Sequence, residues 1–192
     1  MGSSQAEKAA SHERIVKAAA ARIRRDGVDG VGVADLMRDA GLTHGGFYRH
    51  FGSREDLVAE AVEAALAHGS RRSEAAAHLG GPEALAMIID GYLSPLHRDK
   101  PETGCAVAAL PSDIARGGQR ARAAYTAQVR RYLDLLAGMR PGEDPYLILA
   151  ALVGAIALAR AVDDPGLSDE ILERVARTLH RHTQGECAPS AS

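Results

Sequence analysis

GLTHGGFYRHFGSREDL, the stretch from Gly41 to Leu57, decides the fold. Four apolar residues just upstream recur at the spacing of one helix face, namely Val33, Leu36, Met37 and Ala40. Gly41 can adopt the left-handed conformation that ends such a helix, and Thr43 is a suitable N-cap for a second short helix. Two short helices joined by a glycine-containing turn predict a helix-turn-helix.

The second helix has a composition that ordinary packing does not explain. Gly45 and Gly46 would each cost about 1 kcal/mol relative to alanine inside a helix. A helix that lies in a DNA groove gains from such residues, because bare backbone can approach phosphates and base edges closely. Phe47 and Phe51 are four residues apart, so they share a face that can anchor the helix to its own domain.

The sequence of this segment resembles that of the tetR family of bacterial transcriptional regulators. In that family the recognition helix reads roughly V-S-x-G-x-[LF]-Y-x-[HY]-F, followed by x-[ST]-[KR]-[ED]-x-L. Residues 42–51 here read LTHGGFYRHF, and residues 52–57 read GSREDL. The motif covers the N-terminal third of the chain, and beyond it the resemblance rests on length, helical character and helix order. Within the family, GGFYRHF and the later Gly104-Cys105 pair resemble the branch of LmrA- and YxaF-type repressors.

The resemblance implies a role in DNA contact for most of the polar residues in this segment. His44 is expected to contact a base, with Arg49 reaching guanine or phosphate, and Gly45 and Gly46 permit the close approach. Phosphate contacts are expected from the remaining side chains, namely Thr43, Tyr48, His50 and Arg54. The alternative for each is a solvated surface position, or a core position for Tyr48. Relatives carry Thr or Ser before the first motif helix, where this chain has Val31 and Gly32, so only backbone N–H groups could meet a phosphate there.

Composition predicts an all-α protein, and the charge that would favour DNA binding is confined to one segment. The 192 residues are rich in alanine, and only 4% are aromatic. The formal net charge of −2 does not by itself indicate nucleic acid, but no carboxylate lies between Leu42 and Arg54. The N-terminus lacks a signal-peptide pattern, and the uncharged run from Tyr146 to Ala159 is shorter than a membrane span. We therefore expect a cytoplasmic protein with reduced cysteines.

The domain organisation follows from further helical patterns. Residues 8–54 are expected to form the three-helix DNA-binding domain, residues 55–185 a larger helical domain, and residues 186–192 a disordered tail. About nine helices are expected in all. Four of them are defined by their caps and periodicity: Ser11–Asp26, a helix capped by Ser53, Pro145–Val162, and Ser168–His182 capped by Ser168.

The larger domain is expected to form the dimer and to bind an effector, as the family resemblance implies. Small residues in the helix from Pro145 would allow close approach of a second copy, giving a four-helix bundle, although that helix could instead be the monomer's core. A small-molecule pocket between the helices would be lined by some of Tyr92, Leu96, Cys105, Tyr125, Val129 and Tyr132. Cys105 could also sense electrophiles or oxidants, or be a small buried apolar residue.

Two other functional classes fit the sequence less well than a regulator does. An enzyme is disfavoured because His180 and His182 fall on different helix faces and Asp163 with Asp164 reads as a loop. No catalytic or metal site and no cofactor is therefore expected. A helical protein-interaction module, or a thiol-based sensing regulator, remains as an alternative. The sequence best fits a ligand-responsive repressor that binds a palindromic DNA operator as a homodimer and is released by a small molecule.

Overall fold

The computed structural model describes residues 5–77 and 81–183, which contain ten α-helices, two 3₁₀ helices and no β-strand. This confirms the predicted all-α fold class. Within those ranges, no helix has both the length and the apolar character that crossing a bilayer requires. The described residues pack as two compact units, the first drawn from Met1–Gly69 and Pro101–Thr126, the second from Ser70–Lys100 and Ala127–Ser192.

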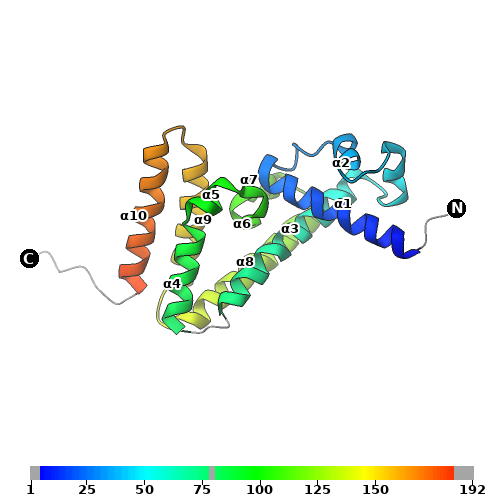
Figure 1. The fold of residues 1–192 in the computed structure, drawn as a ribbon. Coiled ribbons are helices and arrows are strands. Elements are labelled where there is room, and N and C mark those ends of the chain that lie inside the picture. Colours follow the sequence, from blue (N-terminus) through cyan, green and yellow to red (C-terminus); the bar gives the residue numbers. More distant parts are fainter. Residues whose placement is uncertain (1–4, 78–80, 184–192) are drawn as a thin grey trace, which may run out of the picture. The chain divides into compact units, whose positions relative to one another are not determined.

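The first unit contains the helix-turn-helix. Its elements, labelled in Figure 1, are α1 (Gln5–Asp26), α2 (Val33–Asp39), the 3₁₀ helix η1 (His44–Arg49), the first part of α3 (Arg54–Ala77), η2 (Pro101–Thr103), α6 (Ala106–Ala109), α7 (Pro111–Arg116) and the start of α8 (Gln119–Met139). Helix α2 contacts both α1 and η1, and α1 also contacts η2 and α6. The core of this unit therefore forms around α1.

The predicted signals at the ends of these helices are largely confirmed. Gly41 has φ of +70°, and the amide of Leu42 donates to the Met37 carbonyl at 2.8 Å, so the turn after α2 ends the helix as expected. The Ser53 hydroxyl accepts from the Asp56 amide at 3.0 Å and caps α3. These are local interactions, which explains why the sequence pattern alone predicts them.

Two expectations about the N-terminal helices are corrected. The recognition segment is a 3₁₀ helix, and Thr43 precedes it without a side-chain cap hydrogen bond. The Gly46 amide instead donates to the Thr43 main-chain carbonyl at 2.9 Å, so the tight turn is closed by backbone alone. Helix α1 begins at Gln5, six residues before the predicted start at Ser11. The sequence pattern missed its first turns because they are exposed and carry no apolar periodicity.

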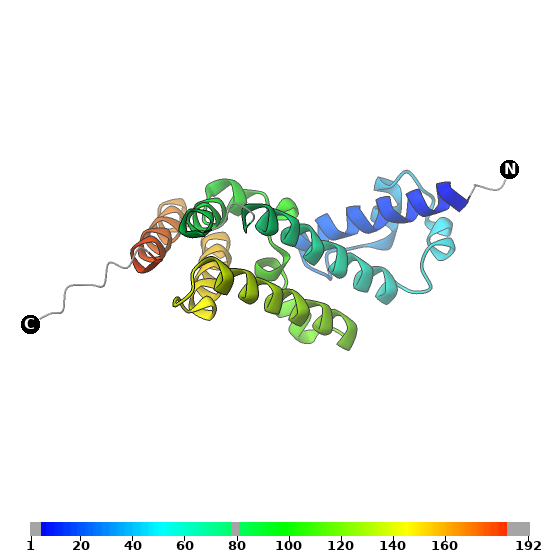
Figure 2. The same ribbon diagram turned by 90° about the horizontal axis from the view of Figure 1, so that it is seen from below.

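The second unit is built on three helices that contact one another: α4 (Gly81–Tyr92), α9 (Pro145–Ala161) and α10 (Pro165–Thr183). Figures 1 and 2 both show α10, in red, beside α9, in orange. The short helix α5 (Pro95–Asp99) contacts α9. Pro95 and Pro101 each begin a new short helix after α4 has ended, a position that the fixed φ of proline suits.

The predicted start of the last helix is wrong. Helix α10 begins one turn earlier, at Pro165, and the Asp164 carboxylate accepts from the amides of Gly166 and Leu167 at its N-terminus. Ser168, the predicted cap, is buried inside the second unit. Its residue type suits a cap, but a tertiary contact determines its position.

Some expectations stay predictions. The predicted tail at 186–192 lies outside the described residues, and so does Cys187. The functional boundary after Arg54 also stays a prediction, since packing into units does not show where DNA binding ends. The segment 101–126, which was expected in the larger domain, packs with the first unit.

Candidate nucleic-acid interface

Two phenylalanines anchor the recognition segment to its own domain. Phe47 and Phe51 are only 2% and 3% exposed, and their rings stack with centroids 5.4 Å apart. Leu36 and Met37 of α2 are also fully buried, and α2 contacts η1. The predicted anchoring face is confirmed. Phe47 and Phe51 turn inward, so they do not cover the opposite side of η1.

The polar side of the segment faces solvent. The Tyr48 side chain is 73% exposed, with its ring edge against Phe47, so the alternative that Tyr48 is a core residue is excluded. Thr43 and Arg49 are exposed as well. The side chain of His44, the predicted base contact, lies outside the described part of the structure, so its role stays a prediction. An aromatic hydroxyl and a cation are thus presented outward beside the two glycines.

Neither glycine in η1 is required by the packing of the chain. A Cβ added at Gly45 would meet no atom within 4 Å, and one at Gly46 would make ordinary contacts with Met37 at 3.5 Å and Thr43 at 3.7 Å. Neither residue has a positive φ. Alanine would therefore fit at both positions and would favour the helix by up to about 1 kcal/mol. The open space in front of Gly45 is available to another molecule.

A cluster of histidines lies behind the end of the recognition segment, and the sequence reasoning missed it. His12 of α1 stacks on Phe51 with centroids 4.5 Å apart, and its Nε2 lies 2.6 Å from Glu60 of α3. The His50 ring is 6.1 Å from that of His12. These contacts join three segments that are distant in sequence. His12 is polar and adds nothing to the apolar periodicity of α1, so the sequence pattern could not reveal these contacts.

His50 is held in its neutral form. Burial, followed by the positive charges of His12, Lys8 and Arg49, lowers the pKa of His50 below its ordinary value near 6.5. Its Nδ1 is buried and has no hydrogen-bond partner among the described residues. A neutral imidazole can donate a hydrogen bond to a phosphate but contributes no charge.

Arg54, another predicted phosphate contact, already has a partner within the chain. Its Nη2 donates to the Val28 carbonyl at 3.0 Å, which ties the start of α3 to the turn after α1. Arginine has five N–H donors, so a phosphate contact through the others stays a prediction.

Residues 15–61 match the model for bacterial regulatory proteins of the tetR family. An uncharacterized HTH-type transcriptional regulator of Mycobacterium tuberculosis is 32% identical over 167 residues, covering 79% of this chain and 85% of the relative. The chain belongs to the tetR family.

Solved structures share the fold of this tetR-family regulator. A TetR transcriptional regulator from Chloroflexus aurantiacus has a TM-score of 0.76 at 23% identity, covering 94% of this chain and 98% of that one. AibR, in complex with isovaleryl coenzyme A and operator DNA, has a TM-score of 0.59 at 19% identity, covering 89% of this chain and 96% of that one. At these identities the likeness shows the fold alone.

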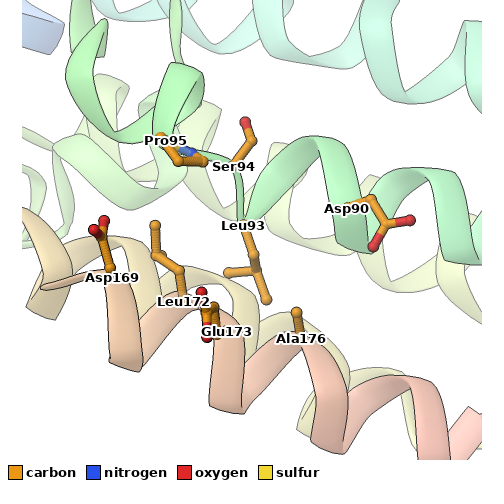
Figure 3. A pocket seen from close by; sticks show the side chains of 8 residues that line it. All are labelled: Asp90, Leu93, Ser94, Pro95, Asp169, Leu172, Glu173 and Ala176. Carbon is orange, nitrogen blue, oxygen red and sulfur yellow. The ribbon is translucent and has the colours of Figure 1, made fainter. Parts of the chain in front are cut away.

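The second unit of the regulator has an open groove between α4, α5 and α10. Its volume is about 380 Å³, within the range of small-molecule sites. Figure 3 shows its lining residues, which are Asp90, Leu93, Ser94, Pro95, Asp169, Leu172, Glu173 and Ala176. None of the six residues predicted to bind an effector is among them. Asp90 and Asp169 have partners already, since they pair with His180 and Arg98.

The predicted effector residues divide between the two units. Cys105 and Tyr125 belong to the first unit. The Tyr125 hydroxyl donates to the Val107 carbonyl at 2.8 Å, and burial raises the pKa of Tyr125 to about 12. Tyr92, Leu96, Val129 and Tyr132 belong to the second. Tyr132 is buried, whereas Leu96 is 62% exposed. Their assignment to one pocket stays a prediction.

Cys105 has a cation near it that sequence alone did not reveal. The thiol is buried, and the buried guanidinium of Arg24 in α1 interacts with it electrostatically. Arg24 also donates through Nε and Nη2 to the Glu102 carbonyl. The predicted thiol-sensing role of Cys105 stays a prediction.

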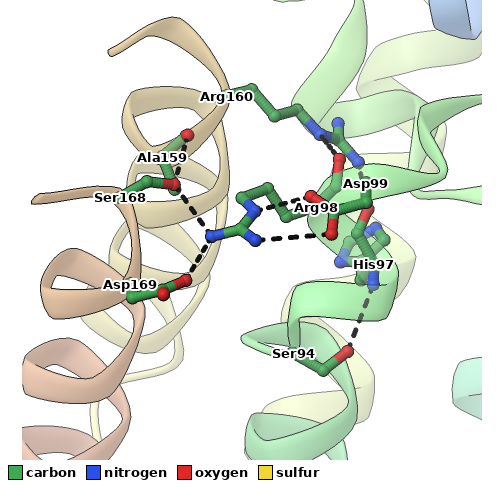
Figure 4. A network of polar contacts seen from close by, with 8 residues as sticks. All are labelled: Ser94, His97, Arg98, Asp99, Ala159, Arg160, Ser168 and Asp169. Atoms are coloured by element: carbon green, nitrogen blue, oxygen red, sulfur yellow. Dashed lines mark hydrogen bonds and ion pairs between the residues drawn. The ribbon is translucent and has the colours of Figure 1, made fainter. Parts of the chain in front are cut away.

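A polar network in the second unit holds α5 against the last two helices (Figure 4). Arg98 of α5 donates to the Ser168 hydroxyl at 3.0 Å and pairs with Asp169. The Ser168 hydroxyl donates to the Ala159 carbonyl at 2.7 Å. Arg160 of α9 donates in turn to the main-chain carbonyls of residues 97 and 98. Each side chain connects two elements, so the network fixes the position of α5 on α9 and α10.

Proposed function

We propose that this chain is a DNA-binding transcriptional repressor that acts as a homodimer on a palindromic operator and is released by a small molecule. The observation that carries the proposal is the open space at Gly45 beside the exposed Tyr48. Inside the chain the glycine has no packing role, although it weakens the helix. A partner that approaches the backbone closely accounts for its presence.

Duplex DNA fits this surface better than a protein partner does. Close approach of a helix backbone is characteristic of groove binding, and the exposed side chains suit phosphates and base edges. His44 is assigned to a base and Arg49 to guanine or phosphate, while Thr43, Tyr48, His50 and Arg54 position the domain on phosphates. AibR, which shares the fold, is known in complex with operator DNA.

The proposed dimer uses α9 and α10. Helix α9 has no charged residue before Arg160, yet Tyr146, Leu147 and Leu158 are 68%, 51% and 58% exposed. Leu147 and Leu158 lie on one stripe with Ala151 and Gly154, whose small size lets a second helix approach closely. An apolar stripe of this kind is best covered by a second copy, because a two-fold axis pairs it with itself. Two reading heads would then address the two half-sites.

The proposed effector is a small molecule bound in the larger helical domain, by some of the six residues predicted above. The resemblance to LmrA- and YxaF-type repressors favours a drug-like compound, and the acyl-coenzyme A bound by AibR shows what a member of this fold can accommodate. Effector and operator would bind to different conformers. A tenfold loss of operator affinity requires only about 1.4 kcal/mol of coupling, and DNA must weaken effector binding equally.

Replacement of Gly45 by alanine tests the DNA-reading role. The probe is a duplex that the wild-type protein itself selects from a random-sequence pool, and binding is measured by gel shift. Gly45→Ala is expected to leave the fold intact and to weaken binding at least tenfold, because the added Cβ occupies the space reserved for DNA. Gly138→Ala is the matched control, since its Cβ also meets nothing within 4 Å but lies in α8. Wild-type affinity in Gly45→Ala would refute the proposal.

Sedimentation velocity tests the dimer. Leu158→Glu places a charge on the exposed stripe of α9 and is expected to give monomers. Met87→Glu, at an exposed apolar position on α4, is the control and should stay dimeric. A dimer that persists in Leu158→Glu, or a monomeric wild type, would remove this part of the proposal.

A further inference from the structure

The basic residues of the N-terminal helices fall into two groups. Three of them are neutralised by neighbouring carboxylates: Arg22 pairs with Asp39 at 2.8 Å, Arg25 with Asp26 at 2.8 Å, and Arg38 with Asp35 at 2.6 Å. In the described part of the chain, by contrast, Lys8 and Arg49 are exposed and take part in no ion pair, and the same holds for Arg14 and Lys17 of α1. A cation without an internal partner is available to an external anion.

Lys8 lies close to the recognition segment although it is distant from it in sequence. It belongs to the part of α1 that precedes the predicted start of that helix. Four residues later, on the same face, His12 stacks on Phe51 at the end of the segment. The charge of Lys8 also acts on His50, as does the charge of Arg49, its neighbour in sequence. Lys8 and Arg49 are therefore the unpaired cations whose charges act on this histidine.

We infer that Lys8, together with Arg49, forms a clamp for the DNA phosphate backbone at the edge of the recognition segment. The inference rests on the proposed DNA-reading function and adds a contact that the motif does not contain. Lysine suits this role because its ammonium is a point charge on a flexible stem and binds phosphate without fixing a base sequence.

The test measures how binding depends on salt. The logarithm of the binding constant falls with the logarithm of salt concentration with a slope of about −0.9 for each phosphate neutralised. Lys8→Gln is expected to make this slope shallower by about 0.9 for each subunit bound, and to weaken binding equally on the selected duplex and on a scrambled one. Lys8→Arg, which keeps the charge, is expected to retain the wild-type slope.

Lys17 provides the matched control. It is exposed on the same helix but lies nine residues further on, or two and a half turns, and so faces the opposite side from Lys8. Lys17→Gln makes the same charge change and is expected to keep the wild-type slope. Glutamine and lysine have similar helix propensities, so both variants should melt at the wild-type temperature.

Two outcomes would overturn the inference. One is a wild-type slope in Lys8→Gln, and the other is an equal loss of slope in Lys17→Gln, which would indicate only the net charge of the domain. Failure of the proposed function is distinguishable, because a wild-type protein that selects no duplex from the pool would have no slope to compare.

Discussion

Replacement of Ser168 by alanine is expected to lower the free energy of unfolding by about 2 kcal/mol. The hydroxyl of Ser168, a residue only 5% exposed, donates to the Ala159 carbonyl at 2.7 Å and accepts from Arg98 at 3.0 Å. Ala159 is buried in the last turn of α9, where carbonyls have no partner within the helix. Leaving a buried acceptor unsatisfied costs about 1–3 kcal/mol. Arg98 keeps Asp169 as a partner, which limits the total.

The measurement is urea unfolding followed by far-UV circular dichroism at fixed protein concentration, supported by thermal melts. For a chain of this size, about 2 kcal/mol corresponds to a fall in Tm of roughly 4–8 °C. A double-mutant cycle of Ser168→Ala with Arg98→Met should show a coupling of about 0.5 kcal/mol or more, because the two side chains share a hydrogen bond.

Asp164→Ala distinguishes the tertiary role of Ser168 from a capping role. If Asp164 is the N-cap of α10, its replacement should cost about 1 kcal/mol and show no coupling to Arg98. A change below about 0.5 kcal/mol in Ser168→Ala, within the usual range for surface substitutions, would refute the reasoning. So would an Asp164→Ala variant as stable as the wild type.

Two further predictions concern the first unit. Phe51→Ala, which empties a site that is 3% exposed, should lower the free energy of unfolding by about 3–5 kcal/mol, whereas Tyr48→Ala on the exposed side should change it by less than about 0.5 kcal/mol; both are measured by urea unfolding. His50 should make stability fall as pH drops below about 6.5, because its pKa is lowered in the folded state and the unfolded chain then binds the proton more readily. His50→Gln should reduce that loss between about pH 7.5 and 5.5, and an unchanged pH dependence would contradict the neutral state assigned to His50.

Much of the fold follows from local sequence, because the interactions concerned span only a few residues. The left-handed turn at Gly41, the Ser53 cap and the buried Phe47 and Phe51 were predictable from residue type and spacing. The helix starts at Pro95 and Pro101 have a local cause as well, since proline restricts its own backbone. The same local pattern identified the recognition segment and carried the resemblance to the tetR family.

Tertiary structure alone decided how polar residues far apart in the chain are used. Nothing in the sequence indicated that His12 would support Phe51 or that Lys8 would lie near His50, because polar residues leave no periodic apolar pattern. Ser168 has the residue type of a helix cap, yet it became a buried link between α9 and Arg98. Such contacts depend on where whole helices pack, and the free energy that determines packing comes mainly from apolar burial elsewhere in the chain.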